Sequence, residues 1–588
     1  MKLDMYMWRH SLTLALLICA GMARANDTIN PGTPWPATDN LGRMVVPGSA
    51  APVPRQDRCV GIFYFLTMGD EVSKLPNDLS KILPQDPELL KKPDSPLWGA
   101  KGPYYWGQPL FGYYDSRDPW VIRRHAALLT DAGIDVVIFD TTNRRTYPEV
   151  YREICKVWSQ ILKEGGRAPK LCFMVNTRAG ETAEELYRNF YQPGLHPELW
   201  FQWQGKPLLI CDPKQASDSV KTFFTLRTAH WPFTMDNTQN RWHWEATYPQ
   251  PYSYDTAPDK PEQVNVSVAQ NLSKTTGTPV NMSSGNARGR SFHNGEQNIT
   301  PGSVARGHNF AEQWQRAIEL DAPFVMITGW NEWTAGKYSR PGEPVAFVDQ
   351  YDQEFSRDIE PVSGLHGDNY YYQMIANIRR YKGAPALATS SPAKSIRLDD
   401  GFAQWQEVGP EFQDHVFDTD HRDFGKGELH YTNTSGRNDL TVLKVARDAA
   451  NVYFYARTRQ SLTPCTGANW MWLLLDTDQN AKTGWEGYDY LVRQTTDGKE
   501  AWLEKNFGGW KWEKVAKVEF ATKGNELMQS VPRAALGLPA GDDVALDFKW
   551  WDNAQKPGDI MDAYLSGDTA PDARFNFRYA TTAAAAVR

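Results

Sequence analysis

Cysteine is scarce in this sequence, and no metal-binding cysteine motif is present. Six cysteines occur among 588 residues, without a CxxC pair or a Cys/His spacing that would indicate zinc. Cys59, Cys172 and Cys211 each fall at or inside an apolar run that is typical of a strand. We therefore interpret them as small buried apolar side chains, and not as part of a disulfide framework.

The sequence also lacks a net positive charge. The net charge is −7 and no run of basic residues occurs, which argues against nucleic acid and anionic membrane surfaces as partners. Beyond the N-terminal segment no apolar stretch reaches the roughly 18 residues of a membrane span. No motif for an organic cofactor stands out. Aromatic residues, in contrast, are abundant: 23 Trp and 26 Tyr supply flat amphipathic side chains that suit polysaccharide binding.

The N-terminus has the pattern of a signal peptide. Lys2 and Arg9 precede an apolar run over residues 12–20, and Ala23-Arg24-Ala25 provides an A-x-A cleavage pattern. The run is too short to cross a bilayer. We expect residues 1–25 to be removed and the mature protein to be secreted or periplasmic.

Apolar runs and helical spacings alternate over residues 56–384, after an extended arm at 26–55. The alternation is the pattern of βαβ units, and it predicts an α/β fold with a parallel sheet. The expected strands cover 59–66, 134–139, 171–175, 207–211, a part of 233–245, 263–268 and 324–329, and the expected helices 118–132, 147–164, 181–190, 310–320 and 368–381.

Polar side chains follow several of these strands. In a closed parallel barrel such positions converge on one face, where catalytic groups lie. The last strand ends in Trp330-Asn331-Glu332-Trp333. Flanking tryptophans offer apolar faces to sugar rings, and they lower the local dielectric constant, which raises the pKa of Glu332 toward proton donation.

This stretch resembles the WNEW signature of proteins related to glycoside hydrolase family 99 and to the WbsX-like group. The family pattern Asn-Glu-Trp-His-Glu-Gly aligns with Asn331 to Gly336, so that its first glutamate is Glu332 and its second is replaced by Ala335. The resemblance implies a (β/α)8 TIM-like barrel. It also implies that Glu332 acts as base or holds the sugar 2-hydroxyl, while Ala335 cannot be the acid/base.

Cleavage of a glycosidic bond requires a second carboxyl group. Glu245, beside Trp244 and His243, is the first candidate, followed by Asp349 or Asp352 and then Asp140. The remaining expected substrate contacts are Trp330, Asn331, Trp333, Asn143, Asn176, His243, Trp244 and Asp349. We interpret Glu354, Arg357 and Asp358 as a structural ion-pair cluster.

The pattern changes after a linker at 385–394. Short alternating runs at 440–445, 451–457, 470–475 and 543–550, with no long helix between them, predict an all-β sandwich over 395–588. This part resembles family 9 carbohydrate-binding modules through Asp400-Gly401-Phe402 and the stretch from Asp476 to Asn480.

Asp476, Asp478 and Asn480 have the 1, 3, 5 spacing with which loops wrap a hard cation, and Asp489 could complete the set. The alternative is a solvated Asx turn. The sequence as a whole predicts a secreted glycoside hydrolase with a structural Ca²⁺ in its C-terminal domain. The alternative is a non-catalytic glycan-binding protein on a degenerate barrel, motivated by Ala335.

Overall fold

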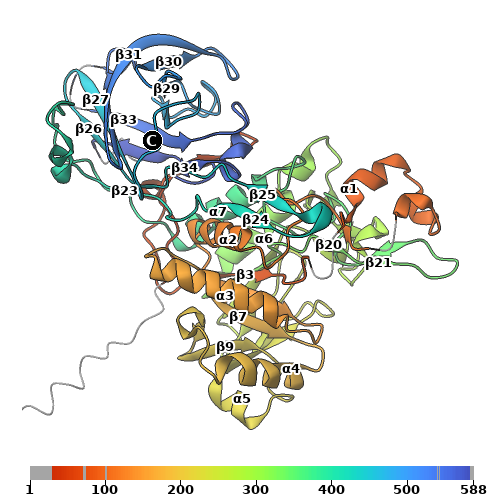
Figure 1. The fold of residues 1–588 in the computed structure, drawn as a ribbon. Coiled ribbons are helices and arrows are strands. Elements are labelled where there is room, and N and C mark those ends of the chain that lie inside the picture. The colour runs from red at the N-terminus through yellow and green to blue at the C-terminus, as the bar shows by residue number, and fades with distance from the viewer. Residues whose placement is uncertain (1–28, 70–73, 100–101, 540, 542, 583–588) are drawn as a thin grey trace, which may run out of the picture.

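The computed structural model describes residues 29–69, 74–99, 102–539, 541 and 543–582. The expected signal peptide therefore lies outside the described residues. Figure 1 shows two parts: a mixed α/β part from the N-terminal arm to helix α7, and a β-rich part in blue. Residues 383–395, between them, contain no helix or strand.

Eight parallel strands form the centre of the first part. They pair side by side from β14 through β19, β3, β6, β7, β9 and β10 to β12. Their bounds are β3 Cys59–Tyr64, β6 Val136–Thr141, β7 Lys170–Val175, β9 Lys206–Ile210, β10 Thr225–His230, β12 Arg241–His243, β14 Gln263–Ser267 and β19 Phe324–Thr328.

The ring closes between β12 and β14 through a side chain. The amide of Gln263 accepts a hydrogen bond from the backbone N–H of His243 at 2.9 Å and donates one to its carbonyl at 2.8 Å. Short strands β11 (Thr238–Gln239) and β13 (Ser253–Tyr254) extend the sheet beside this seam. The arrangement is a nearly closed barrel, consistent with the predicted TIM-like fold.

Helices cover the strands on the outside, and the sequence explains where these helices begin and end. Helix α2 begins because the Asp118 carboxylate accepts the N–H of Trp120 at 3.0 Å, and it ends at Gly133, which has a φ of 85°. The helices are α1 Leu79–Ile82, α2 Pro119–Ala132, α3 Pro148–Lys163, α4 Ala179–Leu186, α5 Asp218–Phe223, α6 His308–Leu320 and α7 Asn369–Lys382.

Two connections between strands contain no helix, whereas a (β/α)8 barrel has one helix after each strand. The residues from 231 to 240 and from 244 to 262 contain no helix. Pro232, Pro249, Pro251, Pro258 and Pro261 lie in them, and proline removes a backbone donor and clashes with a helical turn. The expected (β/α)8 repeat is therefore interrupted before and after β12.

The strand expected within 233–245 is present as β12, and the range also contains the short β11. Strand β10, at Thr225–His230, was not predicted. Strand β10 carries Arg227, which is buried and forms an ion pair with Glu262 at 2.5 Å. A buried charged pair interrupts the apolar run by which a barrel strand is recognised.

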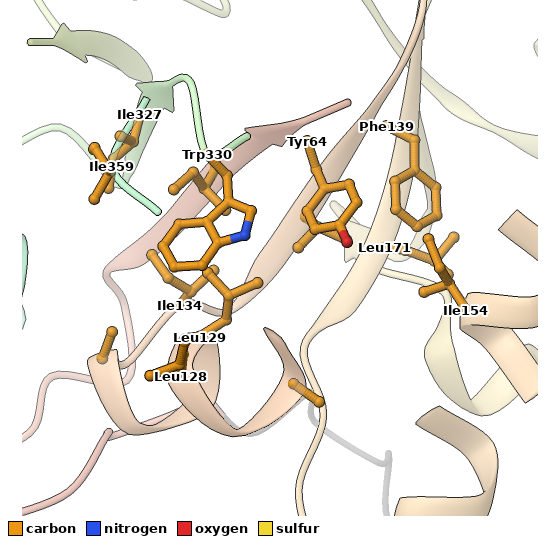
Figure 2. Close-up of a cluster of buried hydrophobic side chains, with 14 of the residues drawn as sticks. Tyr64, Leu128, Leu129, Ile134, Phe139, Ile154, Leu171, Ile327, Trp330 and Ile359 are labelled. Atoms are coloured by element: carbon orange, nitrogen blue, oxygen red, sulfur yellow. The ribbon is translucent and has the colours of Figure 1, made fainter. Parts of the chain in front are cut away.

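The strands are apolar on both faces, as a barrel requires. Phe63, Ile138 and Met326 pack together on the inside, while Ile62, Phe139 and Ile327 belong to the core under the helices. Figure 2 shows Trp330 above the α2 residues Leu128 and Leu129, Phe139 above Leu171 and Ile154, and Tyr64 between the two groups. The described cysteines are free thiols, and Cys59, Cys155, Cys172 and Cys211 are buried, as expected.

The C-terminal part is an antiparallel sheet of eleven strands, which confirms the all-β prediction for this part. Strand β31 pairs with both β30 and β32, and side chains from both halves of the sheet, such as Phe454 and Trp550, meet in one core. The strands are β23 Phe412–Gln413, β26 Leu440–Arg447, β27 Asn451–Thr458, β28 Trp472–Asp476, β29 Tyr490–Gln494, β30 Ala501–Asn506, β31 Trp512–Lys523, β32 Glu526–Pro532, β33 Ala545–Asp552, β34 Asp568–Ala570 and β35 Phe577–Ala580.

A hairpin joins the two parts. Strands β24 (Arg422–Phe424) and β25 (Tyr431–Asn433) lie beside α2 and α7 in Figure 1. Arg422 pairs with Asp118 at 2.7 Å, and the hydroxyl of Tyr431 accepts the N–H of Tyr113 at 2.8 Å. The barrel and the sheet domain therefore share polar contacts that are buried or nearly so. No described helix has the length and apolar character that crossing a membrane requires.

Candidate active site

The carboxyl ends of the eight parallel strands lie at one edge of the barrel, and acidic residues gather there. Glu332 follows β19, Glu245 follows β12, and Asp349 belongs to the loop after β22 (Ala346–Phe347). The same loop carries Arg357. This is the edge at which barrel enzymes place their catalytic groups.

Arg357 connects these carboxylates. Its Nη2 lies 3.0 Å from Glu332 Oε2 and 3.7 Å from Asp349 Oδ1, and its Nη1 lies 3.3 Å from Glu245 Oε2. The guanidinium lies over the ring of Trp244 at 4.7 Å and is almost fully buried. One positive charge thus faces three acidic groups, and this imbalance favours holding at least one of them protonated.

Gln350 and Asp358 position Glu332. The amide of Gln350 donates to Glu332 Oε2 at 2.7 Å and accepts the backbone N–H of Arg357 at 2.9 Å. Asp358 accepts the backbone N–H of Glu332, while its other oxygen accepts the indole N–H of Trp106 at 2.5 Å. Both the backbone and the carboxylate of Glu332 are therefore held in place.

Burial raises the pKa values of the carboxyl groups in this cluster. It raises the pKa of Glu332 well above its usual range, although Arg357 opposes the shift. It raises the pKa of Glu245 to about 7 and that of Asp358 to about 7. Carboxyl groups in such an environment can hold a proton near neutral pH, as a general acid must.

Solvent access separates the candidates. The Glu332 side chain is 14% exposed and that of Asp349 is 47% exposed, whereas Glu245 is 0% exposed. Glu245 Oε1 has no hydrogen-bond partner. Glu332 and Asp349 are therefore accessible from solvent, whereas Glu245 contacts Arg357 from the buried side.

Asp140 lies at the end of β6, inside the barrel. Its Oδ1 accepts the backbone N–H of Thr142 at 3.0 Å and its hydroxyl at 2.7 Å. Burial raises the pKa of Asp140, and the charge of Asp349 adds to the shift. Asp352, in contrast, accepts the N–H groups of Glu354 and Phe355 and stabilises its own loop.

Three polar residues at this edge have different surroundings. Asn143 and Asn176 are exposed, and Asn176 accepts the indole N–H of Trp231 at 2.9 Å. His243 is buried at the barrel seam near the Thr238 hydroxyl, and burial lowers its pKa to about 3. A neutral, buried imidazole at the seam supports the closure of the barrel and is not accessible to a sugar.

The expectation that Trp330, Asn331 and Trp333 bind substrate is not met in this structure, because all three are fully buried. Trp330 packs against His125 and Tyr371. Trp333 stacks on Trp106 with ring centroids 4.8 Å apart, and Asn331 accepts the N–H of Phe65 at 2.8 Å. The buried side chains of Trp330, Asn331 and Trp333 therefore fix the backbone that carries Glu332.

Sequence reasoning missed several residues of the site. Arg357 was assigned to an ion-pair cluster with Glu354 and Asp358, but Glu354 instead accepts hydrogen bonds from Ser291. Gln350 and Trp231 were not singled out. Trp231 is half-buried and its ring lies 5.0 Å from that of Trp244, so it offers an accessible aromatic face near the acids. Its place directly after β10 was hidden because that strand was missed.

The expected cation loop in the sheet domain is brought together in part. Asp476, Asp478 and Asp489 each offer an oxygen, and these oxygens lie within 4.8 Å of one another. The side chain of Asn480 instead accepts the N–H of Lys482 at 3.1 Å. Burial and the charges of Asp547 and Asp489 raise the pKa of Asp476 to about 8. Three carboxylates at this spacing form a donor set that fits Ca²⁺.

A scan of protein-family models and a search of curated proteins find no match for this chain. Among solved structures, two of a family 99 endo-alpha-mannosidase from Bacteroides thetaiotaomicron align with TM-scores of 0.32. Identity is 13% and 16%, over 55% of this chain and 97% of the other. A glycoside hydrolase-like protein aligns with a TM-score of 0.27 and 12% identity, over 57% of this chain and 96% of the other.

Proposed function

We propose that this protein is a glycoside hydrolase that uses Glu332 and Asp349 as its two carboxyl groups. The observation that carries the proposal is that both carboxylates contact one nitrogen of Arg357 at the carboxyl edge of a parallel barrel, and both are partly exposed. Hydrolysis of a glycosidic bond needs two carboxyl groups, of which one is protonated and one is ionised.

The surroundings suggest which group has which role. Glu332 lies among buried groups, and its raised pKa suits a proton donor to the glycosidic oxygen. Asp349 is half-exposed and is the natural partner, either as the base that activates water or as the nucleophile. Arg357 would stabilise the negative charge that Glu332 acquires once its proton has been transferred.

In this proposal Glu245 and Asp140 are not the catalytic carboxyl groups that the sequence led us to expect. Glu245 binds Arg357 from the buried side and positions it toward the other two acids. Asp140 and the exposed Asn143 and Asn176 line the same edge and suit hydrogen bonding to sugar hydroxyls. The ring of Trp231 is the proposed surface for stacking on a sugar face.

A second candidate is a glycan-binding protein that does not cleave. Ala335 favours it, because the second glutamate of the family pattern is absent and Ala335 is buried in a strand pair with Tyr104. Incubation with a panel of oligosaccharides separates the two candidates: new reducing ends indicate a hydrolase, whereas binding without cleavage indicates the second.

We further propose that the protein is exported and that the Asp476, Asp478 and Asp489 loop holds a structural Ca²⁺. Support for export is the N-terminal pattern of residues 1–25 alone. Support for Ca²⁺ is the closeness of the three carboxylates. Cell fractionation tests export, and removal of calcium with a chelator tests the loop.

A further inference from the structure

A second group of carboxylates lies where the sheet domain meets the barrel. It consists of Asp414 and Asp418, which lie between β23 and β24, and Asp568 at the start of β34. One oxygen from each lies within 4.8 Å of the others. Asp418 and Asp568 are more than nine-tenths buried, so water does not surround them.

Each carboxylate of this group has an oxygen without any hydrogen-bond partner. The unpartnered atoms are Asp414 Oδ2, Asp418 Oδ1 and Asp568 Oδ1, and all three are buried. The second oxygen of Asp568 accepts the N–H of Leu440 at 2.6 Å, and that of Asp418 faces Arg124 at 3.5 Å. Protein donors therefore satisfy one side of these carboxylates and leave the other side open. A buried, unpaired carboxylate oxygen is costly, which points to a missing partner.

Nearby cations do not donate hydrogen bonds to the unpartnered oxygens. Lys549 is buried and its charge acts on Asp414 and Asp568, but its ammonium group donates to the carbonyl of Pro571. Arg459 pairs with Asp439 at 2.5 Å, and a further oxygen of Asp439, Oδ1, is also buried without a partner. The neighbouring group of Asp131 and His415 differs, because its members pair directly at 3.1 Å.

We propose that Asp414, Asp418 and Asp568 bind a Ca²⁺ ion that fastens the sheet domain to the barrel. The donors are hard oxygens, which Ca²⁺ accepts in irregular geometry at about 2.3–2.6 Å, a range compatible with the observed spacing. Mg²⁺ fits less well because it demands near-octahedral geometry at shorter distances and gives up its waters reluctantly.

The position of the site gives the ion a structural role. Asp418 also contacts helix α2 of the barrel, since its carbonyl accepts a hydrogen bond from Arg124 at 2.8 Å. Asp568 belongs to the sheet domain and holds the first residue of β26 through Leu440. An ion at this place would join the segment of Asp414 and Asp418, which contacts the barrel, to strand β34 of the sheet. A cavity of about 600 Å³, lined by Asp414 and Asp572 among others, borders the cluster and provides a route for entry.

The test is calcium titration of the full chain after removal of metal with EDTA. Asp476→Asn provides the background, because it disables the other proposed calcium loop. In that background we expect one equivalent of Ca²⁺ to bind at about 1 mM or below, the range of extracellular modules, and the additional change Asp568→Asn to abolish it. Equal uptake with and without Asp568→Asn, or no uptake in either, would overturn the proposal.

A second measurement needs no substitution at the cluster. Hydrogen exchange in the wild-type segment from Phe412 to Phe424 should become at least ten-fold faster when EDTA removes calcium. The same response is expected in Asp476→Asn, and circular dichroism confirms that the chain stays folded. Exchange in this segment that is insensitive to EDTA would show that protons, and not an ion, neutralise the carboxylates.

Discussion

Glu332 and Asp349 contact the same nitrogen of Arg357, at 3.0 Å and 3.7 Å. Their environments differ: the first carboxylate is held by Gln350 and mostly buried, and the second is half-exposed. Burial raises the pKa of Glu332, which suits it to donate a proton, while the half-exposed Asp349 can serve as base or nucleophile.

Arg357→Met should destabilise the barrel by about 3–5 kcal/mol, because it leaves buried carboxylates without their cation. Urea unfolding of the full chain measures this loss. Arg188→Met is the matched control, since Arg188 pairs with Glu184 at 2.6 Å on an exposed helix face. It should cost less than about 1 kcal/mol. Equal losses for the two variants would contradict the central place of Arg357.

Because of Glu245, the free energy of unfolding should fall as the pH rises. Burial raises its pKa to about 7 in the folded chain, from 4.5 as the ordinary value, so the folded state binds the extra proton between these two pH values. Its contribution is fully present below pH 4.5 and is lost toward pH 7, by about 3 kcal/mol in total. Glu245→Gln should lack this part of the pH dependence in denaturant unfolding. A pH dependence identical to that of wild type would show that Glu245 is ionised throughout.

Asp118→Ala should weaken the contact between the hairpin and the barrel. Asp118 caps α2 and also pairs with Arg422 at 2.7 Å, so its removal leaves a buried guanidinium with one partner fewer. We expect a loss of about 3–5 kcal/mol. Ser217→Ala removes the cap of α5 and a hydrogen bond to Glu184 but no ion pair, which together are worth about 1–2 kcal/mol, and serves as the control. A loss no larger than that of the control would show that the ion pair adds nothing.

Calcium should stabilise the sheet domain through Asp476, Asp478 and Asp489. At a hundred-fold excess over Kd the gain is about 2.7 kcal/mol, and EDTA should remove it. Calorimetry of the full chain with and without EDTA measures the shift in melting temperature. Asp478→Ala should reduce this shift by the part that comes from calcium in this loop. If Asp478→Ala responds to EDTA as wild type does, the loop is an ordinary turn.

Sequence patterns predicted those parts of the fold that repeat a simple periodicity. Helix α2 was located from Asp118, its apolar spacing and Gly133, and strand β6 from an uninterrupted apolar run. Strand β10 escaped because Arg227 makes it look polar until its partner Glu262 is known. That partner lies 35 residues further along the chain, just before β14, so no local pattern could reveal it.

The site was predictable where it follows a strand directly. Glu332 and Glu245 were found because each ends a recognisable segment of the barrel. Arg357 was not, because its partners are 25 and 112 residues away and nothing in its immediate surroundings distinguishes it from a surface arginine. The WNEW tryptophans were assigned to sugar binding from residue type alone, whereas packing directs both rings into the core.

The most direct test of the proposed function is hydrolysis of an oligosaccharide panel by wild type, Glu332→Gln, Asp349→Asn and the control Asp212→Asn. Asp212 lies just after β9 at the same edge, but its carboxylate accepts the N–H of Lys214 at 3.0 Å and so stabilises its own turn. We predict that wild type and the control release new reducing ends, while the other two lose about 10²–10⁴-fold in kcat with their fold intact. Turnover by Glu332→Gln close to that of wild type, on a substrate that wild type cleaves, would contradict the account.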